Sequence, residues 1–206
     1  MPPLTPIVIS SAVEGLVDEA VVKRLIVEAG GEIGPIYGKK GKPLLKQRIK
    51  GYNNAALHHP WIVLVDLNHE ANCPPPLKDT WLPDPGAFMC FRIAVREIEA
   101  WLMADRERFA SFFRVRLSDV PTDPELLDDP KEKVIELSRQ SRSRDIRLDM
   151  VPRPGSGRKI GPAYVSRIIE FVSDPIRGWR PDRAVRSSDS LFRCLTRMRE
   201  LVTMLK

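Results

Sequence analysis

Four side chains that could hold a divalent cation come directly after apolar segments of the sequence. Glu14, Asp66, Asn68 and Glu97 each follow a segment that is typical of a buried strand. Carboxylate oxygens are hard ligands suited to Mg²⁺, which commonly uses one or two of them and leaves positions for substrate phosphate and water. A divalent ion of this kind neutralises charge in phosphoryl transfer and activates a water molecule. The acids therefore predict a metal site at the ends of strands.

Each acid also has a structural interpretation when it is taken alone. Glu14, beside Gly15, can favour the start of the next helix by its charge, and Glu97 and Glu99 stand in the first turn of a predicted helix, where acids are stabilised by the helix dipole. Asp66 is harder to explain structurally, because an acid after a buried strand must be solvated, paired or bound to metal. Together the acids favour a functional interpretation.

Lysines at two places in the sequence could contact phosphate. The loop Gly38–Lys42 contains Lys39 and Lys42 but lacks the spacing of a nucleotide-binding P-loop, so ATP binding is not predicted. An ordinary exposed turn explains this loop equally well. Lys131 follows Asp129-Pro130 and could stabilise transition-state charge, or it could simply begin a helix.

The excess positive charge lies in the last third of the chain. Of the 33 basic side chains, residues 139–206 hold 16, of which 14 are arginine, against 7 acidic ones. Arginine matches phosphate with a bidentate fork, and such asymmetry suggests a polyanionic partner. Arg158 and Lys159, in a loop rich in glycine and proline, are candidates for contacts with a nucleic-acid backbone, which would make binding depend strongly on salt. A solvated basic surface is an equally good interpretation of the charge alone.

The elements that must position these residues alternate between strands and helices. This pattern predicts an α/β fold with a mainly parallel sheet that is flanked by helices. Strands are expected at 7–13, 32–37, 61–65 and 87–95, and helices at 18–29, 44–57 and 96–113. Because ligands of such sheets bind outside the carboxyl ends of the strands, the acids are expected to share one rim.

The second half of the chain reads as helical. Residues 1–113 are expected to form the α/β domain, and residues 114–206 a helical, Arg-rich C-terminal extension that packs on it. Helices are predicted at 131–138, 162–172 and 190–205. Proline and glycine predict loops at 68–85 and 144–159.

Composition excludes several classes of protein. Three widely spaced cysteines argue against a disulfide framework and against a zinc site. No apolar run approaches the roughly 18 residues that a membrane span needs, and the first residues, Met-Pro-Pro-Leu-Thr-Pro, do not resemble a signal peptide. We therefore expect a cytoplasmic protein that does not contact membranes.

Several of these motifs resemble one family. Glu14-Gly15 before an amphipathic helix, and Asp66-Leu67-Asn68 after an apolar strand, look like the Toprim (topoisomerase–primase) pattern of a glutamate and a later Asp-x-Asp. The segment 96–105, Arg-Glu-Ile-Glu-Ala-Trp-Leu-Met-Ala-Asp, resembles a Toprim-like bacterial family of unassigned function whose genes often neighbour ATPase genes. Further likeness is seen at 129–131, 161–164 and 188–193.

The resemblance implies a Mg²⁺ or Mn²⁺ site for phosphodiester hydrolysis on nucleic acid. Glu14 would act as general acid and base, Asp66 would hold metal, and Glu97, with Glu99, would add acid, as in nucleases of the overcoming-lysogeny-defect type. The resemblance also suggests a setting in bacterial defence or DNA repair with an ATPase partner of the AAA or ABC type. Asn68 departs from the pattern, because a neutral amide stands where the family has a second acid, although Glu70 is close enough in sequence to compensate.

Two other functions remain open at this stage. In one, the chain is a nucleic-acid-binding or regulatory subunit of an ATPase complex, catalytically weak or inactive because of Asn68. In the other, it is a hydrolase or phosphotransferase that acts on a small nucleotide. The sequence leaves open the choice between DNA and RNA, and it does not exclude an oligomer.

Overall fold

The computed structural model describes residues 6–206, which form two compact units. Unit 1 comprises the chain up to Val95 together with Ser190–Lys206, and unit 2 comprises Arg96–Asp189. The boundaries between the compact units lie after Val95 and after Asp189, whereas the predicted α/β domain ends at residue 113. The first five residues, which entered the argument about a signal peptide, lie outside the described part.

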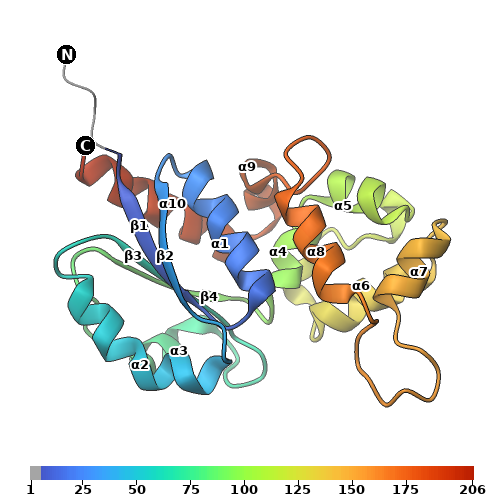
Figure 1. Ribbon diagram of the computed structural model, residues 1–206, viewed down its shortest axis with the longest axis horizontal. Coiled ribbons are helices and arrows are strands. Elements are labelled where there is room, and N and C mark those ends of the chain that lie inside the picture. The colour runs from blue at the N-terminus through green and yellow to red at the C-terminus, as the bar shows by residue number, and fades with distance from the viewer. Residues whose placement is uncertain (1–5) are drawn as a thin grey trace. The chain divides into compact units, whose positions relative to one another are not determined.

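Unit 1 is built on a four-stranded parallel sheet (Figure 1). The strands are β1 (Val8–Val13), β2 (Glu32–Gly38), β3 (Trp61–Asp66) and β4 (Met89–Ala94), in the spatial order β2-β1-β3-β4. Five of the six residues of β3 are buried, as its continuous apolar run requires of a central parallel strand. The expected α/β class with a parallel sheet flanked by helices is confirmed.

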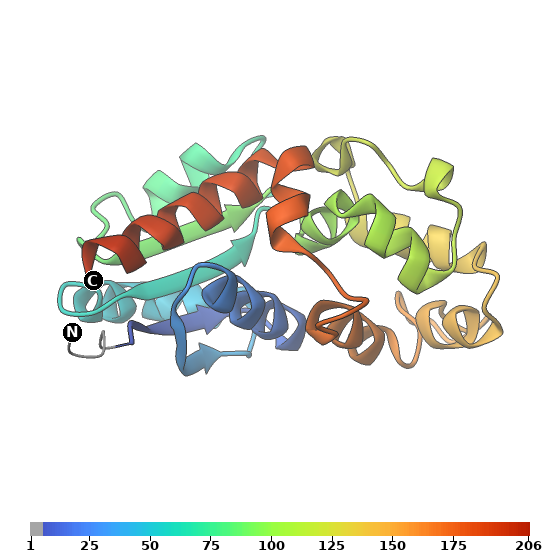
Figure 2. The ribbon, with the colours of Figure 1, turned by 90° about the horizontal axis from the view of Figure 1, so that it is seen from above.

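Helices cover both faces of this sheet. The figures show α2 (Lys42–Ala55) and α3 (Pro74–Trp81) on one face, and α1 (Leu16–Glu28) and α10 (Asp189–Met204) on the other (Figures 1 and 2). The first face contributes Leu45 and Ile49 of α2 to a core with Val63 and Val65 of β3. The last helix of the chain therefore completes the layer arrangement of unit 1.

Strand β2 covers the predicted strand 32–37 and runs through Gly34-Pro35 without interruption. Ile9 of β1 pairs with Ile33, whereas Ser11 pairs with Ile36, so β2 carries one extra residue in a bulge. Because β2 is at the edge of the sheet, the missing N–H of Pro35 costs the ladder little. The strand consequently continues to Gly38.

Unit 2 consists of short helices. The α-helices are α4 (Ile98–Ala104), α5 (Arg106–Phe113), α6 (Pro130–Arg139), α7 (Arg144–Met150), α8 (Tyr164–Ser173) and α9 (Pro181–Ala184), and three 3₁₀ turns lie at Leu117–Asp119, Pro124–Leu126 and Val185–Ser187. Its core includes contacts of Phe171 with Phe109 and Phe113, whose ring centroids lie 5.9 and 5.4 Å away. The indole N–H of Trp179 donates to the carbonyl of Trp101 at 3.0 Å, so this buried polar atom is satisfied.

Three of the predicted elements are wrong. The expected loop 68–85 contains α3, which begins with Pro74-Pro75, and proline is well tolerated in the first turn of a helix. The expected loop 144–159 contains α7, whose N-cap is Ser143, and the Ser143 hydroxyl accepts the Ile146 N–H. The expected helix 96–113 is two helices that meet at Asp105, where the backbone leaves the helical region.

No helix within residues 6–206 is both long enough and apolar enough to cross a membrane.

Candidate functional site

Glu14 and Asp66 lie together where the order of strands reverses. The chain moves from β1 outward to β2 and then returns to the other side of β1 to form β3, so the carboxyl ends of β1 and β3 flank a topological switch point. Open parallel sheets bind ligands at such points. The backbone N–H of Asp66 donates to Glu14 Oε1 at 2.9 Å, which joins the two strand ends directly.

The loop after β2 folds over the end of β1 beside Glu14. Lys39 N–H donates to the Val13 carbonyl at 2.8 Å, and Gly41 N–H donates to the Glu14 carbonyl at 3.0 Å. Gly38 has a φ of +89°, and a Cβ there would lie 2.2 Å from the Val13 carbonyl oxygen. Only glycine allows this close approach, so Gly38 fixes the path of the loop 38–42 past the end of β1.

Lys42 brings a cation to the same edge. It is the first residue of α2, its ammonium group donates to the Asp66 carbonyl, and it forms an ion pair with Glu70 at 2.7 Å. Its side chain is only 11% exposed. Glu70, the acid close enough in sequence to replace the missing second acid of the pattern, is thus paired with Lys42.

Lys39 and Asn68 are placed differently. Lys39 pairs with Glu19 of α1 at 3.2 Å. The hydrogen bond with Lys23, and after it the one with Lys39, lowers the pKa of Glu19. Asn68 is half-buried two residues after β3 and has a φ of +51°, a left-handed conformation that asparagine tolerates better than most residues. Lys42 is therefore the lysine of this loop that contacts the end of β3.

The structure adds one acid that sequence reasoning assigned another role. The predicted helix 18–29 would begin at Asp18, but α1 begins two residues earlier, with Gly15 at its N-cap, and Asp18 lies in the first turn. Its side chain is buried, and a Cβ on Gly15 would lie 3.3 Å from Asp18 Oδ2. The Asp18 carboxylate thus lies next to the residue that follows Glu14. In the sequence, the spacing of four residues between Glu14 and Asp18 was the signal that could have placed the two acids near each other.

Glu97 belongs to unit 2, where it forms a cluster with Lys131. The Lys131 backbone N–H donates to Glu97 Oε2 at 2.8 Å, and its ammonium group lies 3.1 Å from Glu97 Oε1 and 3.5 Å from Glu99 Oε1. Tyr164 donates its hydroxyl proton to Glu99 Oε1 at 3.0 Å. The structure therefore brings Glu97 and Lys131 together within one unit, as it does Glu14, Asp66 and Lys42 within the other.

Burial dominates the electrostatics of this unit 2 cluster. Glu99 is 2% exposed, and its Oε2 has no hydrogen-bond partner within residues 6–206. Burial, with repulsion from Glu97, raises the pKa of Glu99 despite the opposing attraction of Lys131. Burial and the neighbouring Glu99 likewise raise the pKa of Tyr164 well above its usual value. A buried carboxyl with a raised pKa keeps its proton up to a higher pH than an exposed glutamate does.

Arg158 and Lys159 lie in an exposed loop of unit 2. Gly155 and Gly157, which precede this pair, have positive φ values, and the Arg158 N–H donates to Ser156 Oγ at 3.3 Å. Both side chains are exposed, and neither forms an ion pair within the described part of the chain. They are thus available to an external anion.

The side chains at the ends of β1 and β3 are of the types that bind a magnesium ion. No group of three or more His, Cys, Asp and Glu side chains that could hold a metal occurs in residues 6–206. Mg²⁺ is nevertheless commonly bound through one or two carboxylates, with water and substrate phosphate completing its coordination. Glu14 and Asp66 provide two half-buried carboxylates at neighbouring strand ends, and Asn68 provides an amide oxygen two residues on.

Comparison of the chain with protein-family models, with curated proteins and with solved structures finds no match.

Proposed function

We propose that the protein hydrolyses phosphodiester bonds of nucleic acid with Mg²⁺ or Mn²⁺. The observation that carries the proposal is the hydrogen bond from Asp66 N–H to Glu14 Oε1, which joins two acid-bearing strand ends at the switch point of a parallel sheet. The resemblance of the sequence to Toprim-like proteins supports the same chemistry.

Each residue of this edge would have a distinct task. Asp66, with Asn68, would hold the metal ion, which supplies charge neutralisation and an acidified water when it is bound. Glu14 would accept a proton from the attacking water and return it to the leaving oxygen. Lys42 is tied to Asp66 and Glu70, so it would hold the strand end in place and offer positive charge to an incoming phosphate.

The cluster of Glu97, Glu99 and Lys131 would give unit 2 an acidic and a cationic group that could respond to a bound ligand. Lys131 faces both Glu97 and Glu99, which makes it a cation whose charge is largely compensated. A phosphate or a metal ion that displaces one of these ion pairs would alter the protonation of Glu99.

Asn68 favours a second candidate function. A neutral amide supplies one negative charge fewer than the aspartate of the Asp-x-Asp pattern, so metal binding would be weaker. The protein would then bind nucleic acid without turnover, as a regulatory subunit beside an ATPase partner. Its cleavage activity, measured alone, separates these two functions.

The test is a cleavage assay on plasmid, single-stranded DNA and RNA, with Mg²⁺ or Mn²⁺ against EDTA. Glu14→Gln retains an oxygen that accepts the Asp66 N–H, and Asp66→Asn retains the side-chain volume, so both variants should fold. We expect metal-dependent cleavage by the natural sequence and a loss of at least 100-fold in each variant, in line with removal of a general base or a metal ligand.

Matched controls come from acids away from this edge. Glu32→Gln lies at the opposite end of β2, and Asp79→Asn lies on the exposed side of α3; each makes the same change of charge and should cleave normally. Cleavage that survives in both Glu14→Gln and Asp66→Asn would refute the site. Metal binding and nucleic-acid binding without cleavage by the natural sequence would favour the regulatory function.

A further inference from the structure

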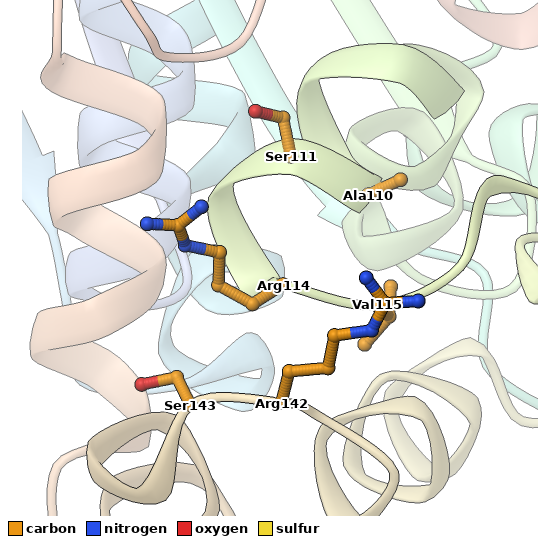
Figure 3. A pocket seen from close by; sticks show the side chains of 6 residues that line it. All are labelled: Ala110, Ser111, Arg114, Val115, Arg142 and Ser143. Carbon is orange, nitrogen blue, oxygen red and sulfur yellow. The ribbon is translucent and has the colours of Figure 1, made fainter.

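A pocket in unit 2 is lined by two arginines that the candidate site does not use. It lies between the end of α5 and the start of α7, has a volume of about 490 Å³, and is lined by Ala110, Ser111, Arg114, Val115, Arg142 and Ser143 (Figure 3). Cavities of roughly 300–1,000 Å³ accept ligands of nucleotide size. The lining, as far as the structure describes it, includes no acidic residue.

The two arginines keep their positive charge available. Arg114 and Arg142 are exposed, and neither guanidinium forms an ion pair or a hydrogen bond within residues 6–206. By contrast, Arg116 and Arg139, which are also exposed in this unit, are paired with Asp119 at 2.8 Å and with Glu132 at 3.2 Å. The pocket therefore concentrates uncompensated arginine charge.

The walls of the pocket are fixed by hydrogen bonds. The Arg142 N–H donates to the Arg114 carbonyl at 3.0 Å, and the buried Ser141 hydroxyl donates to the Phe113 carbonyl at 2.6 Å. These bonds occupy carbonyls at the C-terminus of α5, which would otherwise present partial negative charge to an anion. The backbone of Arg114 is left-handed, with a φ of +54°, and this turns the chain at the pocket wall.

Hydroxyl groups add donors to this cationic lining. Ser143 Oγ accepts the Ile146 N–H at 3.4 Å, so its own proton remains for another acceptor. Ser111 is exposed on the opposite wall (Figure 3). Arginine forks and hydroxyl donors are the groups that most commonly contact phosphate oxygens in nucleic-acid complexes.

The arrangement of the arginines selects an extended anion. In Figure 3 the guanidinium groups of Arg114 and Arg142 point to different sides of the pocket, so they offer two cationic positions rather than one shared position. One isolated phosphate would use only one of them. A concave site also admits an unpaired strand more easily than the convex surface of a stiff duplex.

We propose that this pocket binds successive phosphates of a single-stranded nucleic acid through Arg114 and Arg142. The inference rests on the proposed function in taking nucleic acid as the substrate, and it adds the strand type and the residues that hold it. Binding through two phosphates is sequence-independent and falls with added salt.

The test measures binding without hydrolysis. Anisotropy titrations in EDTA would compare a labelled 20-nucleotide single-stranded DNA with the duplex of the same sequence between 50 and 200 mM NaCl. The variant is Arg114→Gln with Arg142→Gln, and the control, with the same loss of charge in the same unit, is Arg116→Gln with Arg139→Gln. Each phosphate contact to a single strand contributes about 0.7 to the salt slope.

We expect the pocket variant to lose about 1.4 from the slope of log K against log salt, and its affinity to fall on the order of tenfold, while the control changes much less. Equal changes in both variants, a preference for the duplex, or no binding by the natural sequence would overturn the proposal. Competition by free ADP that depends on the two arginines, with an unchanged strand slope, would instead make the pocket a site for a free nucleotide. If the single strand binds through the two arginines but is not cleaved by the natural sequence, the pocket proposal is supported and the proposed nuclease function is contradicted.

Discussion

Glu99 is an acid that water scarcely reaches, and its environment decides its protonation. The Lys131 ammonium group and the Tyr164 hydroxyl contact Glu99 Oε1. Burial, together with repulsion from Glu97, nevertheless raises the pKa of Glu99. A carboxyl whose folded pKa lies above its unfolded value binds more protons in the folded state. The free energy of unfolding therefore falls as pH rises through the window above the ordinary value near 4.5.

Glu99→Gln should remove this pH dependence. Gln retains an oxygen for the Tyr164 hydroxyl but carries no charge, so the variant should be as stable as the natural sequence near pH 4 and more stable, by about 1–3 kcal/mol, near pH 8. Urea unfolding at both pH values measures this difference. Glu136→Gln, an exposed acid of α6, is the control, and a Glu99→Gln variant that loses stability at pH 8 would show that its charge is favourable in the fold.

At the scale of elements, Asp105 divides α4 from α5. Its buried carboxylate accepts three hydrogen bonds from Arg180: the backbone N–H and Nε at 2.9 Å, and Nη2 at 2.6 Å. This pairing holds the pKa of Arg180 above its ordinary value, chiefly through the Asp105 hydrogen bonds. The break in the helix is thus stabilised by a partner 75 residues away in the sequence.

Asp105→Asn should destabilise unit 2 strongly. The amide nitrogen of asparagine cannot accept a hydrogen bond, and the remaining neutral group leaves the Arg180 charge poorly compensated, so we expect a loss of about 2–3 kcal/mol. Glu107→Gln is the matched control, because Glu107 also pairs with Arg180 but is 76% exposed, and it should cost less than about 1 kcal/mol. Denaturant unfolding of both variants measures the difference, and equal effects would contradict this role of Asp105.

At the scale of the whole molecule, unit 2 is an insertion between β4 and α10. The chain leaves unit 1 after Val95 and returns at Ser190, and the Val95 N–H lies 3.4 Å from Ser190 Oγ, so the two ends of the insertion meet within unit 1. Helix α10 buries apolar residues along one side, including Leu191, Leu195 and Met198. Unit 1 therefore needs this C-terminal helix to close its core.

Unit 1 should fold without unit 2. A chain that joins Val95 to Ser190 by a short glycine linker should give a cooperative thermal transition and a dispersed amide NMR spectrum, because loop closure over a few residues costs little. A chain that ends at Val95 should not fold, since it lacks α10. If the joined chain fails to fold while the full protein unfolds in one transition, unit 2 is required for the stability of unit 1.

Local patterns in the sequence determined much of unit 1. The apolar run at 61–65 and the helical spacing that follows the first strand predict β3 and α1 because burial within a parallel sheet imposes those patterns directly. The same patterns put Glu14 and Asp66 at strand ends. The prolines at the start of α3 were wrongly predicted to lie in a loop, because proline in the first turn of a helix and proline in a loop look alike in sequence.

Only the tertiary structure decided which of these residues meet. The strand order β2-β1-β3-β4 makes β1 and β3 neighbours, and this brings Asp66 N–H to Glu14 across 52 residues of chain. The return of α10 to the sheet and the break at Asp105 likewise depend on partners far away in sequence. Periodicity reports how a segment is buried, whereas the identity of the partner that buries or pairs with it is set by the global packing of the chain.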